Sequence, residues 1–144
     1  MQEKNPSWKL PYPRKCHAFN LRQASLAVTA LYDKHMERAG VTIQQFSLLW
    51  HIKELSPISV THLAEAMNLD RTTLSRNLAL LKRKGFWEEV PSPGRQRQIQ
   101  LTPDGLNIFM NAQRAWQTAQ DELEERLGRE NVALLESLLS PLWR

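Results

Sequence analysis

The chain has 144 residues, of which 42% are hydrophobic and 24% are charged, and its formal net charge is +4. This size and balance predict one compact domain and exclude collagen-like, low-complexity and wholly disordered chains. No uncharged apolar stretch approaches the roughly 18 residues of a membrane-spanning helix, and no signal peptide is evident, so we expect a soluble, cytoplasmic protein.

The N-terminal half begins with a segment that cannot be regular helix. Pro6, Pro11 and Pro13 interrupt it, and we interpret residues 1–16 as an extended arm. Apolar side chains then recur at spacings of three and four, which predicts a long helix that stops at Gly40. Thr42 is placed to cap a second helix, which ends before Ser56-Pro57.

The next two helices are short and flank the turn Asn68-Leu69-Asp70. Ser59 or Thr61 caps the first helix, and Asp70 caps the second, which ends at Gly85. In the second helix the leucines share one side, and the opposite side and its flanks carry Thr72, Thr73, Ser75, Arg76 and Arg83. Small hydroxyls and arginines let a helix approach phosphates closely and reach base edges. This face is therefore predicted to bind DNA, the alternative being a solvated charged surface.

After Gly85 the hydrophobic period changes from helical to alternating. FWEEV and RQIQLT predict two strands, and PSPGRQ joins them as a hairpin with a basic tip that carries Arg95 and Arg97. Residues 71–97 hold seven Arg and Lys side chains against two Glu, which favours a polyanionic partner. Two short helices followed by a basic hairpin are the order of a winged helix-turn-helix.

Thr102-Pro103 opens the last segment, a helix through about Leu127 and then the apolar stretch VALLESLLSPLW. The short remaining chain cannot cover these helices, so they are expected to pack against a second copy rather than into an intramolecular core. Trp116, Leu123, Leu135 and Leu138 are expected in or near that interface. The predicted fold is mainly α: residues 17–56 and 103–144 dimerise, and 57–102 form a winged helix-turn-helix with a two-stranded wing.

The stretch LAEAMNLDRTTLSRNLALLKRKGFWEEVPSPGRQRQIQLTPDG resembles the core of the multiple antibiotic resistance regulator (MarR) family of dimeric winged helix-turn-helix transcription factors. The resemblance covers residues 17–140 and includes LYDKHMERAGVTIQQFSLLWHI. It implies a homodimer on a pseudo-palindromic operator in double-stranded DNA, probed in the major groove by Thr72, Thr73, Ser75 and Arg76. It also implies that Arg95 or Arg97 in the wing enters the adjacent minor groove.

The wing departs from the family pattern at one position. The family usually places an acidic residue two positions before its wing arginine, where the carboxylate orients the guanidinium, but here Pro93 lies two before Arg95. Pro91 and Pro93 would then have to supply the rigidity of the wing. Which of the two arginines enters the groove is left open by the sequence.

A small effector is expected to bind where the first two long helices meet the long C-terminal helix. Tyr32, His35, Trp50 and His51 are the candidates, because aromatic walls with a few polar groups suit a small phenol or aromatic acid. The alternative is that these rings only pack in the core. We expect a repressor that the ligand releases from DNA by binding the DNA-free state more tightly, and an activator is the alternative.

Cys16, the single cysteine, offers a second trigger. Its position near the start of the first helix resembles the hydroperoxide-sensing branch of the family, where a thiolate is activated by tyrosines, and Tyr32 matches one of these. The second tyrosine falls at Ile43, and Cys16 lies about two residues early, so an ordinary cysteine is the alternative. Nearby Arg14 and Lys15 would lower the thiol pKa. A thiol-dependent enzyme is a further alternative, but no catalytic motif supports it, so no enzyme activity and no cofactor are expected. His17, His35, His51 and His62 lack metal-binding spacing.

Overall fold

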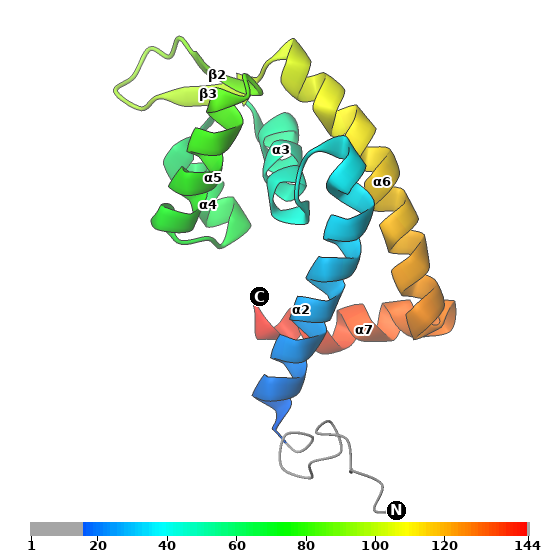
Figure 1. Ribbon diagram of the computed structural model, residues 1–144. Helices are drawn as coiled ribbons and strands as arrows, with labels where there is room; N and C mark the ends of the chain where they lie inside the picture. The colour runs from blue at the N-terminus through cyan, green and yellow to red at the C-terminus, as the bar shows by residue number, and fades with distance from the viewer. Residues whose placement is uncertain (1–15, 144) are drawn as a thin grey trace, which may run out of the picture.

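The computed structural model describes residues 16–143, so all of the predicted N-terminal arm except Cys16 lies outside the described residues. The chain forms a mainly helical fold with one small sheet (Figure 1). The helices are α2 (His17–Met36), α3 (Ile43–Leu55), α4 (Val60–Met67), α5 (Arg71–Arg83), α6 (Pro103–Leu127) and α7 (Val132–Leu139). Three short 3₁₀ helices join or follow them: η2 (Glu37–Ala39), η3 (Arg129–Asn131) and η4 (Ser140–Leu142). The strands are β1 (Ile58–Ser59), β2 (Trp87–Val90) and β3 (Gln98–Leu101).

The polar caps set where the helices begin. Thr42 and Gln45 form a reciprocal capping box at α3, and the Thr102 hydroxyl accepts the Gly105 amide at α6. Of the two candidates for α4, Ser59 is the cap, since its hydroxyl accepts the His62 amide. Asp70 caps α5, as predicted. Each cap satisfies an amide that would otherwise have no helical partner.

The predicted wing hairpin is confirmed, and one strand was missed. β2 and β3 pair antiparallel with Trp87 opposite Leu101. β1, which the sequence does not signal, pairs antiparallel with the other edge of β3 and places Ile58 opposite Ile99. A strand of two residues is too short to show an alternating pattern, so periodicity could not reveal it.

The main core joins the wing, the helix-turn-helix and α3. Its largest fully buried side chains are Met36, Phe46, Leu48, Leu49, Ile52, Leu63, Leu74, Leu81 and Ile99. They come from α2, α3, α4, α5 and β3. The short helices α4 and α5 and the wing therefore share one core with α3. Leu31, Tyr32 and Ala119 form a second, smaller cluster between α2 and α6.

Two helical surfaces find no cover within the protomer. Every described side chain from Cys16 to Ala27 is exposed, and α7 has no buried residue. Figure 1 shows α7 at the end of α6 that lies away from the wing. Leu135 and Leu138 on α7 are 37% and 63% exposed, whereas Trp116 and Leu123 on α6 are half-buried. Exposed apolar faces of this kind mark protein–protein contacts.

Candidate nucleic-acid interface

Helix α5 separates a buried side from a polar outer side. Leu74, Leu78 and Leu81 are buried against the core, which fixes the rotation of the helix about its axis. The outer side is exposed and carries Thr72, Ser75, Arg76, Ala79 and Arg83. In the described chain Arg76 and Arg83 have no ion pair, so both guanidinium groups are available to an external anion.

Thr73 stands apart from the other outer residues because the cap of α5 uses its hydroxyl. The Asp70 carboxylate accepts the Thr73 amide at 2.9 Å and the Thr73 hydroxyl at 2.7 Å. These hydrogen bonds hold the pKa of the Asp70 carboxyl below its usual range. Thr73 is also half-buried, so its side chain holds the first turn of α5 rather than facing outward freely.

The wing carries its two arginines in different environments. Arg97 lies 3.4 Å from the Glu89 carboxylate, measured from Nη1 to Oε1, and Lys82 of α5 pairs with the same oxygen at 3.6 Å. Arg95, nearer the hairpin tip, is exposed and has no carboxylate partner in the described chain. The sequence did not single out Glu89, because its partners lie on other segments.

Three contacts join the wing strands to α5 and to the turn that follows it. The Trp87 indole on β2 donates to the carbonyl of Leu78 on α5 at 2.8 Å, and the Lys82 ammonium lies 4.9 Å from the centre of that ring. The Thr102 hydroxyl donates to the carbonyl of Gly85. The wing and the outer side of α5 are therefore held together as one surface.

Only two of the four predicted effector residues line one cavity. Trp50 and His51 line a cavity of about 450 Å³ whose other walls are Ile43, Phe46, Ser47, Glu54, Leu55 and Trp116. Trp50 and Trp116 meet edge to face with ring centres 5.3 Å apart. The His51 Nδ1 lies 2.7 Å from the Ser47 carbonyl; because a carbonyl only accepts, this nitrogen carries the proton. The sequence predicts Trp116 in or near the dimer interface, and in the structure it also lines this cavity.

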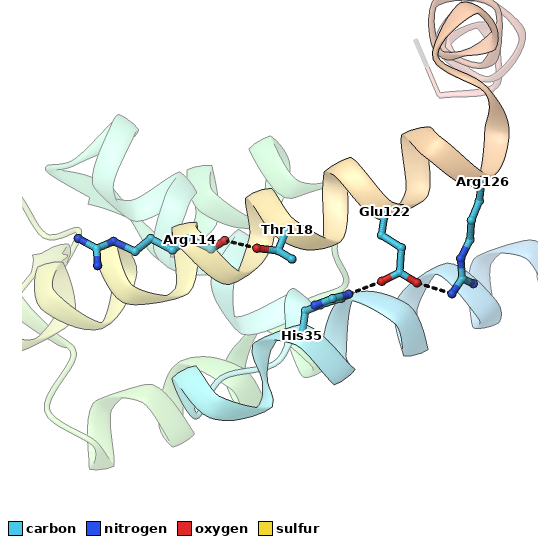
Figure 2. A network of polar contacts seen from close by, with 5 residues as sticks. All are labelled: His35, Arg114, Thr118, Glu122 and Arg126. Carbon is cyan, nitrogen blue, oxygen red and sulfur yellow. Dashed lines mark hydrogen bonds and ion pairs between the residues drawn. The ribbon is translucent and has the colours of Figure 1, made fainter.

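Tyr32 and His35 instead bridge α2 to α6. The Tyr32 hydroxyl donates to the Gln120 side chain, and burial raises the pKa of that phenol, with Glu124 adding to the shift. His35 Nε2 lies 2.5 Å from the Glu122 carboxylate, which Arg126 also contacts (Figure 2). The hydrogen bond from His35 is the main cause that lowers the pKa of Glu122. Neither Tyr32 nor His35 lines the cavity formed by Trp50, His51 and Trp116, which we call the aromatic cavity.

Cys16 is exposed at the N-cap position of α2, and its predicted activators Arg14 and Lys15 lie outside the described residues. Among residues 16–143 there is no cluster of three or more His, Cys, Asp or Glu side chains able to hold a metal ion. Within the same range no helix is both long and apolar enough to cross a membrane.

Comparison with known proteins decides the family. The family model described as "MarR family" matches residues 39–98. The multiple antibiotic resistance protein MarR of Salmonella typhimurium is 32% identical over 115 residues, which cover 78% of this chain and 80% of the relative. The chain belongs to the MarR family. This confirms the resemblance found in the sequence and makes the protein a transcriptional regulator of the winged helix-turn-helix type.

Solved structures of one family repressor resemble this MarR family chain closely. The transcriptional repressor CouR bound to a 23-mer DNA duplex superimposes with a TM-score of 0.84 at 25% identity, covering 91% of this chain and 94% of the repressor chain. CouR bound to p-coumaroyl-CoA gives a TM-score of 0.85 at 25% identity, with 94% and 97% coverage. The same fold is thus known in a DNA-bound and in a ligand-bound form.

Proposed function

We propose that this MarR family regulator is a homodimer that binds a pseudo-palindromic operator, represses transcription and leaves the DNA when a small aromatic ligand binds. The observation that carries the proposal is the outer side of α5, where Thr72, Ser75 and Arg76 are exposed and Arg76 has no internal counter-ion. CouR, which has the same fold, is known bound to a DNA duplex.

On DNA, the outer side of α5 lies in the major groove. The hydroxyls of Thr72 and Ser75 are short enough to let the helix backbone approach the bases and phosphates, and Arg76 reaches a base edge. Arg83, about two turns further along, contacts the phosphate backbone. The wing places Arg95 in the neighbouring minor groove, since Arg97 is drawn toward Glu89.

A homodimer accounts for the uncovered faces of α2 and α7. Two-fold symmetry brings the exposed apolar side chains of the two copies together and spaces the two α5 helices about one helical turn of DNA apart. The operator then has the matching pseudo-palindromic symmetry. Because α2 and α6 both lead toward the DNA-binding residues 57–102, a change in their packing alters the spacing of the two reading helices.

The cavity between α3 and α6 is the proposed effector site. Its Trp50 and Trp116 rings and the free Nε2 of His51 offer stacking and one hydrogen bond to a small aromatic molecule. CouR, whose fold matches, is known bound to p-coumaroyl-CoA, which contains an aromatic ring. The ligand releases DNA only if it binds the DNA-free arrangement more tightly than the bound one. Tyr32 and His35 then act through the α2–α6 contact rather than by touching the ligand.

Redox sensing through Cys16 has less support from the geometry. The Tyr32 hydroxyl, the matching phenol of the peroxide-sensing branch, donates to Gln120 in its own chain. We also propose that the protein has no enzymatic activity and works in the cytoplasm, because a relative, FarR of Neisseria gonorrhoeae, is a transcriptional regulator and a MarR of the same fold is known bound to operator DNA.

Operator binding is tested first. Fragments selected from random DNA are titrated by fluorescence anisotropy with wild type, Arg76→Ala and the control Arg129→Ala, which removes an exposed arginine of η3, beyond the end of α6. We expect the Arg76 variant to lose about 1 to 3 kcal/mol of binding free energy and to discriminate bases less well. Equal affinities for all three proteins would contradict the assignment of α5.

Operator release is tested with salicylate-like acids and hydroperoxides in wild type, Trp50→Ala and Cys16→Ser. We expect aromatic acids to release wild type and not the Trp50 variant. Release by peroxide that is lost in the Cys16 variant would support the thiol switch instead. Aromatic release that is unchanged in Trp50→Ala would exclude the α3–α6 cavity as the effector site.

A further inference from the structure

A second cleft lies on a different face of α6 from the aromatic cavity. It has a volume of about 430 Å³ and is lined by His35, Arg38, Ala39, Ile108, Asn111, Arg114, Ala115 and Thr118. At 100° per residue, Trp116 of the aromatic cavity points away from Asn111, Ala115 and Thr118. The two cavities share no lining residue.

The charge in this cleft is one-sided. Arg38 comes from η2 and Arg114 from α6, no carboxylate lines the cleft, and neither arginine forms an ion pair within the described chain. Two guanidinium groups that line one hollow make its electrostatic potential positive, which favours an anion.

Glu122, one turn after Thr118 on the same face of α6, already has two side-chain partners. Glu122 is contacted by both His35 and Arg126 (Figure 2), and these contacts keep its pKa low, so it stays ionised with two cationic or hydrogen-bonding partners. It therefore leaves Arg38 and Arg114 without compensation. Nε2 of His35 contacts the Glu122 carboxylate. The imidazole therefore lines the cleft but is not expected to bind the anion through that nitrogen.

We propose that this cleft binds a small organic dianion, a dicarboxylate or a phosphate monoester. Arg38 and Arg114 each present a planar guanidinium suited to two parallel hydrogen bonds with one anionic group. The Asn111 amide, which has no partner in the described chain, adds a donor, and the Thr118 hydroxyl, which donates to the Arg114 carbonyl at 3.2 Å, keeps acceptor capacity. Ala39, Ile108 and Ala115 offer an apolar wall to the carbon part of the ligand.

Such a ligand would tie η2 to α6. Beyond η2 the chain passes through Gly40 into α3, and α6 starts directly after β3 and Thr102. Fixing η2 on α6 therefore restrains the segment that enters α3 and the helix that directly follows the DNA-binding residues 57–102. The dianion is expected to change operator affinity in addition to any effect of the aromatic ligand, with a coupling that requires unequal affinity for the two arrangements.

Calorimetric titration without DNA tests the binding, so its result does not depend on the proposed function. Inorganic phosphate and succinate are titrated at constant ionic strength into wild type, Arg38→Gln, Arg114→Gln and the control Arg129→Gln, with acetate as the monoanion comparison. Circular dichroism and thermal unfolding establish that each variant is folded. Arg129 is exposed and belongs to η3, outside the cleft, so its variant removes the same charge elsewhere.

We expect saturable binding of at least one dianion to wild type and to Arg129→Gln, weakened about tenfold or more by either cleft substitution, since each removes charge-assisted hydrogen bonds. The stronger of phosphate and succinate identifies the ligand class. Three results would overturn the site: no saturable binding to wild type, an equal loss in Arg129→Gln, or a loss in only one of the two cleft variants.

Discussion

The Glu89 carboxylate on β2 lies 3.4 Å from the Arg97 guanidinium across the wing hairpin. The same oxygen is 3.6 Å from the Lys82 ammonium at the end of α5. In the family pattern an acidic residue two positions before the wing arginine orients the guanidinium of that arginine. In this chain the position two before Arg95 is Pro93. Strand β2 thus supplies a carboxylate to the wing, but to Arg97 rather than to Arg95.

This arrangement predicts unequal roles for the two wing arginines. Arg95→Ala should lose more operator affinity than Arg97→Ala, because only Arg95 is free of a competing carboxylate. In a Glu89→Gln background Arg97 is released, so the gap between the two variants should narrow. Anisotropy titrations at several salt concentrations measure both the affinities and the number of phosphate contacts. A larger loss for Arg97→Ala in the wild-type background would contradict this order.

Gly105, in the first turn of α6, is predicted to tolerate no side chain. A Cβ at this position would lie 2.0 Å from the Phe86 carbonyl oxygen, which belongs to the backbone and cannot move aside cheaply. Alanine gains up to about 1 kcal/mol of helix propensity, but the overlap should outweigh it and leave Gly105→Ala destabilised by about 3 kcal/mol.

Gly94→Ala is the matched control for Gly105. Its Cβ would meet no atom within 4 Å, so its free energy of unfolding should change by less than about 0.5 kcal/mol. Urea unfolding of both variants checks the comparison, and a Gly105→Ala protein as stable as wild type would show that the start of α6 does not pack against Phe86 in this way.

Asp70 gives α5 a pH-dependent cap. Its folded-state pKa is lowered from 3.8, first by the amide of Thr73 and then by the Thr73 hydroxyl. A depressed carboxyl pKa stabilises the fold fully above the unfolded value and loses that contribution as pH falls through the folded value. Wild type should therefore lose stability relative to Asp70→Asn below about pH 3.8. Unfolding curves of both proteins at several pH values provide the test, and a pH-independent difference would contradict it.

Much of this fold could be predicted because its signals are local. The caps Thr42, Asp70 and Thr102 lie next to the helices they start, and the alternation in β3 spans enough residues to be recognised. The site was harder to predict. The contacts of Tyr32 and His35 could not be predicted, because their partners Gln120 and Glu122 are 88 and 87 positions away, and sequence spacing carries no information about contact over such a separation.

The cleft at Arg38 and Arg114 shows the same limit. Each arginine by itself suggests only a solvated surface residue, and neither belongs to the basic stretch of residues 71–97. Their common hollow arises because α2 and α6 pack side by side, which depends on the small cluster of Leu31, Tyr32 and Ala119.

The exposed face of α7 leads to a prediction about assembly. Leu138 is 63% exposed, and a charge there should be harmless in a monomer but costly in an apolar interface. Leu138→Glu should shift the mass measured by light scattering toward the monomer and weaken operator binding. Leu55→Glu changes a 44% exposed leucine on α3 rather than on the uncovered faces of α2 and α7, and this variant should remain dimeric. A wild-type protein that is monomeric at micromolar concentration would contradict the interface.

The central claim is that two copies of α5, held by one dimer, read successive turns of the same face of DNA. Hydroxyl-radical footprinting of the selected operator, combined with the measured number of protomers per duplex, tests it most directly. The account predicts two protomers per duplex and two protected segments related by two-fold symmetry, about one helical turn apart. One protomer per duplex, or a single protected segment, would contradict it.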